Sequence, residues 1–416
     1  MEKKKKPAIR FKGFTDSWEQ RKLGNFGKAS GGTSIESEFS EDGIYKVINI
    51  GSYSENSIYN DQGIRAIKSD KTSNRVLNRN DLTMILNDKT TSGNIIGRVL
   101  LIEESGIYVY NQRTERIEID LDEYDPVFLY EMLNAPNIRE KIIKQAQGNT
   151  QIYVNWTAIS LLEYMIPSKE EQAKIGEYLH SISNLITLHQ RKYDKLQIIK
   201  KSMLEKMFPQ NGSCFPEIRF KGFTDSWEQR KLGDVASSFE YGLNAAAKAY
   251  DGEYKYIRIT DIDDNTHEFL TDNLTSPDID LIGADNYKLT EGDILFARTG
   301  ASVGKSYIYR NSDGLVYYAG FLIRARINEE YDEEFVFQNT LTDRYNKYIA
   351  VTSQRSGQPG VNAQEYAEFE INVPKKEEQT KIGTYFRNLD YLITLHQREV
   401  EKLQNIKKSM LETMFV

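Results

Sequence analysis

The chain has 416 residues, which is more than one hydrophobic core usually organises, so two or more domains are expected. Its net charge of −7 weighs mildly against nucleic acid, although a net value does not show where basic residues gather. One cysteine, Cys214, excludes an internal disulfide, the four histidines follow no metal-binding spacing, and no run approaches the ~18 apolar residues of a membrane span.

The N-terminal region combines a basic stretch with a segment that recurs later. MEKKKK leads into PAIRFKGF rather than into an apolar run, which is not a secretory signal pattern, so we expect a cytoplasmic protein. Residues 9–24 read IRFKGFTDSWEQRKLG, and residues 218–233 repeat all sixteen letters. Phe11 and Trp18 predict a short edge segment that packs onto a domain, and its recurrence indicates identical surroundings for both copies.

Residues 25–160 read as a domain of short strands and helices. YKVINIG (45–51) is strand-like, DLTMILN and RVLLIEE flank a polar loop, and IYVYNQRTERIEI alternates. Residues 125–147 read as one or two helices broken at Pro136. The pattern predicts an α+β fold.

The polar loop of this domain reads NDKTTSGNIIGR, with Gly93 and Gly97 followed by a basic residue. Two interpretations are open: a glycine-shaped connection between strands, or a loop whose small residues let the backbone approach a phosphate chain. In the second interpretation, the polar side chains of the loop face DNA, and they are Lys89, Thr90, Thr91, Ser92, Asn94 and Arg98.

The segment QGNTQIYVNW, further along the chain, also begins with glycine and polar residues. Its apolar part predicts core. Amide side chains suit adenine edges, so Gln147, Asn149 and Gln151 are weaker candidates for DNA contact.

Residues 167–208 predict one long helix. Ser168 stands three residues before Glu171, a capping-box pattern, and no further proline follows. At ~1.5 Å per residue, roughly 38 residues would extend about 57 Å, so the helix needs a partner along its length. Apolar residues at 3, 4 and 7 spacings predict a coiled-coil seam, interrupted by His189 and Lys192. The seam residues are Leu185, Leu196, Ile199 and Met203.

The second half of the chain follows the same plan. Its long helix, residues 374–415, is offset from the first by 207 residues (374 − 167), and the sixteen-letter repeat is offset by 209 (218 − 9). One unit of about 208 residues therefore occurs twice, which indicates a domain duplication. The natural partner of each long helix is the other one. The matching seam residues are Leu392, Leu403, Ile406 and Met410, and His396 and Glu399 interrupt them.

The second domain contains the loop ARTGASVGK, which almost spells a phosphate-binding P-loop. Thr299 stands where the first glycine belongs, and the strand-like YIYR follows instead of a helix, so we reject ATP binding here. Strand-like runs at 254–260 and 317–327 and a helical stretch at 333–351 complete the domain. The DNA-contact candidates are Arg298, Thr299, Ser302 and Lys305, with Arg355 and Gln358 from the later segment RSGQPG.

The order of these parts resembles the specificity subunit of type I restriction–modification enzymes. The residues that carry the resemblance are the duplicated WEQRKLG, the GDILFARTGASVGK loop, the paired P-x-x-E-E-Q helix openings and both long helices. The resemblance covers essentially the whole chain. It divides the chain into target-recognition domains at 1–166 and 218–373, spacer helices at 167–208 and 374–416, and a linker at 209–217.

The resemblance implies a fold and a set of partners. Two pseudo-two-fold-related recognition domains would be joined by two long helices packed as an antiparallel coiled coil. Each domain would read one half of a bipartite, asymmetric site in double-stranded DNA. Helix length would set the unread gap, and two methyltransferase subunits would bind the shared regions, with ATP-dependent restriction subunits as possible further partners.

Catalysis is expected to lie outside this chain. There is no Asn/Asp-Pro-Pro-aromatic motif for amino-group methylation, no credible P-loop and no convincing nuclease cluster. We assign it no catalytic residue, no metal site and no cofactor, and S-adenosylmethionine, ATP and Mg²⁺ would belong to the partner subunits. Two alternatives stay open: a scaffold without DNA binding, and a stand-alone nuclease with an unrecognised site.

Overall fold

The computed structural model describes residues 6–90, 92–149, 151–210, 212–355 and 357–416. They form two compact units, unit 1 (Met1–Leu188 with Glu399–Val416) and unit 2 (His189–Arg398). Each unit combines one mixed domain with part of both long helices, so the border between the units falls inside the helices. The boundaries of the domains, spacer helices and linker expected from the sequence differ from those of these units, and they stay a prediction.

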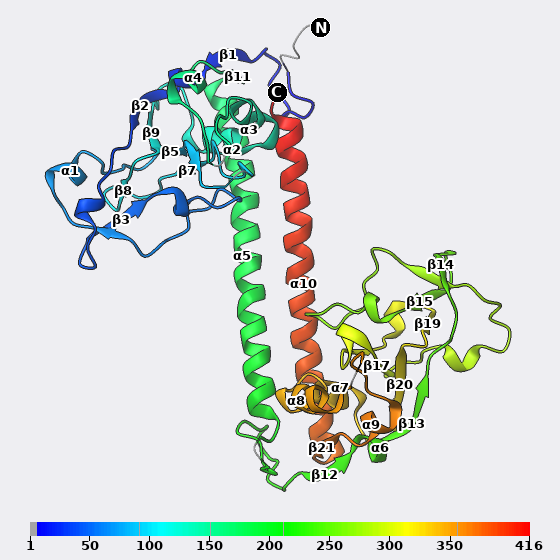
Figure 1. The fold of residues 1–416 in the computed structure, drawn as a ribbon. Helices are drawn as coiled ribbons and strands as arrows, with labels where there is room; N and C mark the ends of the chain where they lie inside the picture. Colours follow the sequence, from blue (N-terminus) through cyan, green and yellow to red (C-terminus); the bar gives the residue numbers. More distant parts are fainter. Residues whose placement is uncertain (1–5, 91, 150, 211, 356) are drawn as a thin grey trace. The chain divides into compact units, whose positions relative to one another are not determined.

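Unit 1 is built on a four-stranded antiparallel sheet in the order β2–β9–β5–β7 (Figure 1). A second sheet has the order β4–β3–β8, with β3 and β8 parallel, and the pairs β1–β11 and β6–β10 are antiparallel. The strands are β1 (Glu19–Lys22), β2 (Gly27–Gly31), β3 (Tyr45–Ile48), β4 (Arg65–Ala66), β5 (Leu82–Ile85), β6 (Asn87–Asp88), β7 (Val99–Leu101), β8 (Tyr108–Tyr110), β9 (Thr114–Ile119), β10 (Ile152–Tyr153) and β11 (Glu163–Ile166).

Two helices follow β9, as the sequence predicted, and Pro136 separates them. Asp125 caps the first by accepting a hydrogen bond from the backbone N–H of Phe128 at 2.8 Å, and Pro126 stands at its first position, where the missing N–H is not needed. The helices of this domain are α1 (Asp70–Ser73), α2 (Pro126–Asn134), α3 (Pro136–Ile143) and α4 (Trp156–Ile159).

Unit 2 repeats the four-stranded sheet and the pair formed by its first and last strands, while its smaller pairs differ from those of unit 1. Its four-stranded sheet has the order β13–β20–β17–β18, and the remaining strands pair as β12–β21, β14–β16 and β15–β19. The strands are β12 (Glu228–Lys231), β13 (Ala236–Tyr241), β14 (Ala247–Ala249), β15 (Lys255–Ile257), β16 (Thr275–Pro277), β17 (Ile294–Ala297), β18 (Ser306–Ile308), β19 (Val316–Tyr318), β20 (Leu322–Ile327) and β21 (Glu370–Val373). The helices are α6 (Leu232–Val235), α7 (Glu333–Asn339), α8 (Asp343–Thr352) and α9 (Ala363–Ala367).

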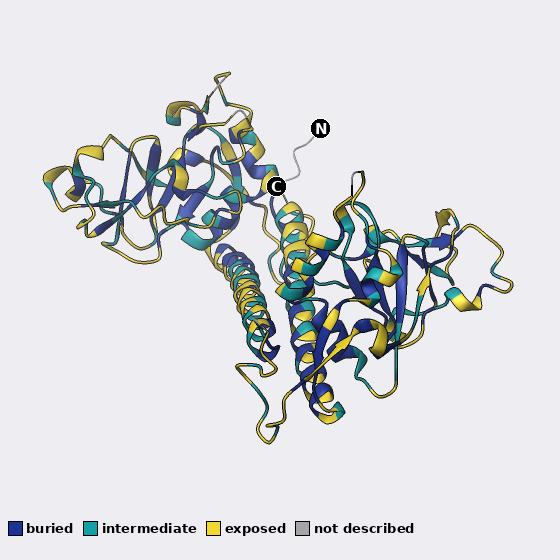
Figure 2. Cartoon of the chain, turned by 60° about the horizontal axis from the view of Figure 1, so that its bottom comes forward, coloured by how far each residue is buried: buried dark blue, intermediate teal, exposed yellow. Residues whose placement is uncertain are grey.

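The core of each domain lies between the four-stranded sheet and the helices. β5 and β17 are buried at all four positions, as central strands covered on both faces are expected to be. The cores also take in the last residue of a long helix and the phenylalanine after it: Met414 and Phe415 in unit 1, and Met207 and Phe208 in unit 2. Buried positions follow these sheets, while many long-helix positions are exposed (Figure 2).

The long helices are α5 (Lys169–Met207) and α10 (Lys376–Met414). Within unit 2, Lys200 Nζ lies 2.5 Å from Asp390 Oδ1, and His189 Nδ1 lies 3.0 Å from His396 Nδ1. Residue numbers rise along one helix as they fall along the other, so these helix segments are antiparallel. The two histidines that interrupt the apolar pattern therefore face each other inside the pair.

Only part of the predicted seam is covered by apolar side chains. Leu196, Ile199 and Met203 pack against the unit 2 core. Leu185 and Leu392 are 44% and 39% exposed, because the apolar clusters that cover the helix ends do not reach them, and their role in the seam stays a prediction. Leu403, Ile406 and Met410 are half-buried, and Met410 packs against the unit 1 core.

The repeated sequence motifs attach each domain to its long helix. The Arg10 guanidinium donates to both carboxylate oxygens of Glu171 at 2.5 and 2.6 Å, and Arg219 binds Glu378 in the same way at 2.7 and 2.8 Å. Gln172 Oε1 accepts the backbone N–H of the α2 capping residue at 3.0 Å, as Gln379 does for α7. The P-x-x-E-E-Q motif is therefore structural in both units.

The described residues contain neither a membrane-spanning helix nor a group of side chains placed to hold a metal ion. None of their helices combines the length and apolar character that crossing a membrane requires. No group of three or more histidine, cysteine, aspartate or glutamate side chains among them is placed to hold a metal ion.

Candidate nucleic-acid interface

In unit 1 the two predicted contact segments lie together. β6 begins the loop and pairs with β10 in the register Asn87↔Tyr153 and Asp88↔Ile152. The later segment is a hairpin, because the backbones of Gln147 and Tyr153 exchange two hydrogen bonds of 2.9 Å. Strand β10 of this hairpin therefore lies next to the start of the glycine loop.

The carboxylate of Asp88 holds the start of the glycine loop through hydrogen bonds. Its buried carboxylate accepts the backbone N–H and the hydroxyl of Thr90, both at 2.8 Å, and the Thr90 hydroxyl lies 2.7 Å from that of Ser92. Asp88 thus holds Thr90, which in turn contacts Ser92, and the side chains of Lys89, Thr90 and Ser92 are exposed.

Arg139 of α3 holds the other end of the loop. Its guanidinium donates to the carbonyl oxygens of Ile96 and Asn94 at 2.9 and 2.7 Å. Burial, with the nearby Arg98 cation, lowers the pKa of Arg139 to about 10, which leaves it charged at neutral pH. Gly97 is required here, since a β-carbon would lie 2.6 Å from the Ile142 side chain and φ is +70°.

Unit 2 brings its two segments together with a shorter loop. The N–H of Val361 donates to the carbonyl of Arg298 at 2.9 Å, and the N–H of Gly300 donates to that of Pro359 at 3.0 Å. Gly304 is needed for the same reason as Gly97, since a β-carbon would meet Ile349 at 2.5 Å. After Lys305 the chain enters strand β18, as predicted, so no helix N-terminus stands behind the loop.

The basic residue at the end of each loop is bound within the protein. Lys305 Nζ lies 2.5 Å from Asp264 Oδ1 and 2.9 Å from the Ile262 carbonyl oxygen. Arg98 donates to the Ser57 hydroxyl at 3.0 Å. Both residues therefore support a neighbouring turn, and they are weaker candidates for base contact than the exposed loop side chains.

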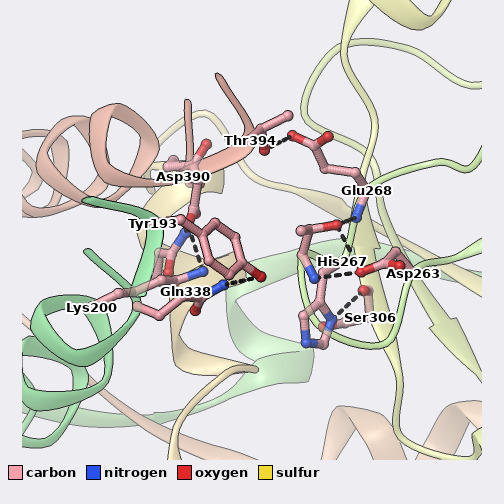
Figure 3. A network of polar contacts seen from close by, with 12 residues as sticks. Tyr193, Lys200, Asp263, His267, Glu268, Ser306, Gln338, Asp390 and Thr394 are labelled. Atoms are coloured by element: carbon pink, nitrogen blue, oxygen red, sulfur yellow. Dashed lines mark hydrogen bonds and ion pairs between the residues drawn. The ribbon is translucent and has the colours of Figure 1, made fainter. Parts of the chain in front are cut away.

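The turn beneath the unit 2 loop is fixed to a long helix (Figure 3). His267 has φ +58° and donates from Nδ1 to the Ser306 carbonyl at 2.9 Å, and burial lowers the pKa of this histidine. Glu268 accepts from the Thr394 hydroxyl of α10 at 2.8 Å. The glycine loop of unit 2 is thereby coupled to the helix through His267 and Glu268.

The predicted contact residues divide into two groups by exposure, while Thr91 lies outside the described residues. The half-buried ones are Arg98, Arg298, Thr299, Ser302 and Lys305. The exposed ones are Lys89, Thr90, Ser92, Asn94, Gln147, Asn149, Gln151, Arg355 and Gln358. Arg355 folds back on its own unit, since its guanidinium donates to the Thr352 carbonyl at 2.7 Å and pairs with Glu365. Asn94 donates to Glu55 at 2.8 Å.

Some residues beside these segments were not predicted. The Arg298 guanidinium lies over the Tyr241 ring, 5.0 Å from its centroid, and Tyr241 is 43% exposed. Phe321 lies beside Arg298, because its carbonyl oxygen accepts the N–H of Arg298. Its side chain is 58% exposed. The sequence signal for the first residue was Tyr241 directly before a glycine, and for the second it was the Gly-Phe pair at Phe321 between two strands.

Comparison with known proteins places the chain in a family. Residues 15–197 and 224–405 match the family described as "Type I restriction modification DNA specificity domain". The chain belongs to this family of specificity subunits.

Relatives and one solved structure agree with this assignment. The type I restriction enzyme MjaVIII specificity subunit of Methanocaldococcus jannaschii is 22% identical over 356 residues, which cover 82% of this chain and 79% of that protein. The putative MjaX specificity subunit of the same organism is 22% identical over 309 residues, 71% of this chain and 67% of that protein. The type I restriction–modification S subunit of M. genitalium has a similar fold, with TM-score 0.66 and 17% identity over 99% of both chains.

Proposed function

We propose that this chain recognises a bipartite, asymmetric site in double-stranded DNA, with each unit reading one half. The proposal rests on the contrast between the attachment and the loops of the two units. The attachment repeats side chain for side chain, as in Arg10–Glu171 and Arg219–Glu378. The exposed loops are placed alike but differ in length and sequence. Two units with the same attachment to the helices but different exposed loops suit a DNA site with two different halves.

The loop chemistry supports DNA as the ligand. Apart from Arg355, the exposed candidates are lysine, threonine, serine, asparagine and glutamine side chains, which bind phosphates and base edges. Arginine stacked on tyrosine, as in Arg298 on Tyr241, is a further element of nucleic-acid surfaces. The net charge of −7 is then a property of the whole chain and not of these loops.

The long helices serve as spacer and docking surface in this proposal. Leu185 and Leu188 are exposed on α5, and Leu392 and Leu395 are exposed at the same places of the repeat on α10. Two equal apolar patches suit two copies of one partner, the methyltransferase subunit. S-adenosylmethionine would bind to that partner, and ATP and Mg²⁺ to restriction subunits, so this chain acts without catalysis of its own, in the cytoplasm.

The test is to map methylated bases in cells that carry the partner methyltransferase, with and without this chain. We expect one interrupted sequence to be methylated only when the chain is present. In parallel, binding of the purified complex to that site should weaken steeply with salt, as phosphate neutralisation requires. Absence of salt-dependent binding would favour a scaffold, and metal-dependent cutting by the isolated chain would favour a nuclease.

A further inference from the structure

Three chain segments of unit 1 form one backbone row at the centre of the candidate interface. The N–H of Leu86 donates to the carbonyl of Arg113 at 2.9 Å, and the N–H of Val154 donates to the carbonyl of Leu86 at 2.9 Å. Leu86 directly precedes the glycine loop, Val154 directly follows the hairpin, and Arg113 ends the turn between β8 and β9. This last segment belongs to neither of the predicted contact segments.

Unit 2 contains the same row with different side chains. The N–H of Arg298 donates to the carbonyl of Phe321 at 3.0 Å, and the N–H of Val361 donates to the carbonyl of Arg298 at 2.9 Å. Arg298 therefore occupies the place of Leu86, and Phe321 that of Arg113. Each row carries one arginine beside one apolar residue, in opposite order.

The backbone conformation at Arg113 indicates that the fold does not require an arginine side chain at this position. Its φ is +68°, a left-handed conformation that favours glycine or asparagine over a long side chain. The guanidinium is exposed, and the contact found for it is with Gln151 Oε1 at 3.5 Å, the weak limit of a hydrogen bond. Strained positions of this kind gather at functional sites.

We propose that Arg113 is a specificity-determining residue of unit 1, which contacts a guanine in its half of the DNA site as Arg298 does in the other half. The inference rests on the proposed function. An arginine fork reaches guanine O6 and N7 with two parallel hydrogen bonds, which lysine cannot reproduce. Because the two arginines stand at different places of the row, they reach different positions within their half-sites.

The experiment uses the complex of the full chain with its methyltransferase and a DNA library with both half-sites randomised. Arg113→Lys keeps the charge, and Arg113→Gly removes the side chain while relieving the left-handed strain. We expect both variants to lose roughly 5- to 150-fold of the preference for guanine at one position of one half-site. Arg298→Lys should relax one position of the other half-site.

The controls separate a reading role from folding. Arg113→Gly should melt at the wild-type temperature or above it, since glycine suits φ +68°. Arg79→Ala, an exposed arginine of the same unit, should leave both half-sites unchanged. If the wild-type complex prefers no sequence, the proposed function fails. If it is specific and both Arg113 variants keep every guanine preference, the assignment of Arg113 alone is overturned.

Discussion

Glu115 illustrates how one residue can differ between equal scaffolds. It lies on β9, where the corresponding position of β20 is Ile323, a buried core residue. Burial raises the pKa of the Glu115 carboxyl to about 7, and the positive charge of Arg75 opposes this only in part. The unfolded chain has the ordinary value near 4.5. Between these two pH values the folded chain binds the proton more tightly, so rising pH lowers stability.

Replacing Glu115 by glutamine should remove this pH dependence. Glu115 is buried, and relaxation of the surrounding structure reduces the penalty above pH 7 to the order of 1 kcal/mol. We expect Glu115→Gln to unfold about 2–4 °C above wild type at pH 8, with a smaller difference at pH 5. Thermal unfolding followed at both pH values measures it, with the exposed Glu118→Gln as control. An equal difference at both pH values would contradict the assignment.

Gly176 is a second residue that the scaffold constrains. It lies within α5, yet a β-carbon there would meet the backbone nitrogen of Phe128 at 2.8 Å and Asp125 Oδ1 at 2.9 Å. The start of α2 thus packs directly on the backbone of the long helix. Gly383 is its counterpart, where a β-carbon would lie 2.4 Å from Asp332 Oδ1.

Alanine at position 176 should therefore destabilise unit 1 although alanine favours helices. The gain in helix propensity is about 1 kcal/mol, and overpacking costs about 1–3 kcal/mol. We expect a net loss of about 1 kcal/mol, read as a lower unfolding temperature and faster hydrogen exchange in α2. Ser181→Ala, exposed on the same helix, should change stability by less than about 0.5 kcal/mol. A Gly176→Ala variant more stable than wild type would refute the packing argument.

At the scale of elements, each unit neutralises one long-helix lysine in its own way. Lys407 contacts Glu131 of α2 at 2.8 Å and the Ser183 hydroxyl of α5 at 2.7 Å. In unit 2 the matching Lys200 contacts Asp390 of α10, and the residue from α7 is the neutral Gln338 (Figure 3). The carboxylate partner of the lysine therefore lies on the domain helix α2 in unit 1 and on the long helix α10 in unit 2, while the lysine is the same.

This exchange predicts a rescue. Glu131→Gln alone leaves Lys407 without a carboxylate partner in a largely buried place and should cost about 2 kcal/mol. Adding Ser183→Asp recreates the unit 2 arrangement and should restore most of the loss. A double-mutant cycle on unfolding free energy measures the coupling. If the effects of the two substitutions on the unfolding free energy were additive, the aspartate introduced at position 183 would not replace Glu131 as the partner of Lys407, and the predicted rescue would be contradicted.

At the scale of the whole molecule, the long helices are the elements that a spacer requires. α5 and α10 each run 39 residues without interruption, about 58 Å at 1.5 Å per residue. Both are crossed by the border between the compact units, at Leu188 and at Arg398. If the helices act as the proposed spacer, changing their length at that border alters the gap between the half-sites without replacing any residue inside either unit.

We predict that seven residues inserted after Leu188 and after Arg398 abolish methylation at the original gap length. Seven helical residues add about 10.5 Å, the length of about three base pairs. A library of sites with longer gaps, methylated by the variant complex, tests the idea. A seven-residue insertion in the exposed loop around Gly63 is the control. Unchanged methylation of the original site by the helix variant would contradict the spacer role.

The sequence by itself determined the architecture. The 207- and 209-residue offsets showed the duplication, the run after Pro167 showed the long helix, and Pro136 correctly divided two helices. These features are local in the chain or repeated along it, so periodicity, caps and breakers report them directly. The glycine pairs likewise marked the loops that the fold brings beside the two later segments.

The tertiary structure decided which side chains of those loops are free. Arg98 and Lys305 looked like DNA contacts, but residues more than 40 positions away along the chain bind them. Leu185 lies on the apolar face of a helix that no apolar cluster covers at that point. Arg113 stands out only through its left-handed backbone and its place in the row beside Leu86. Pairing between distant segments fixes all of these, and no local pattern records it.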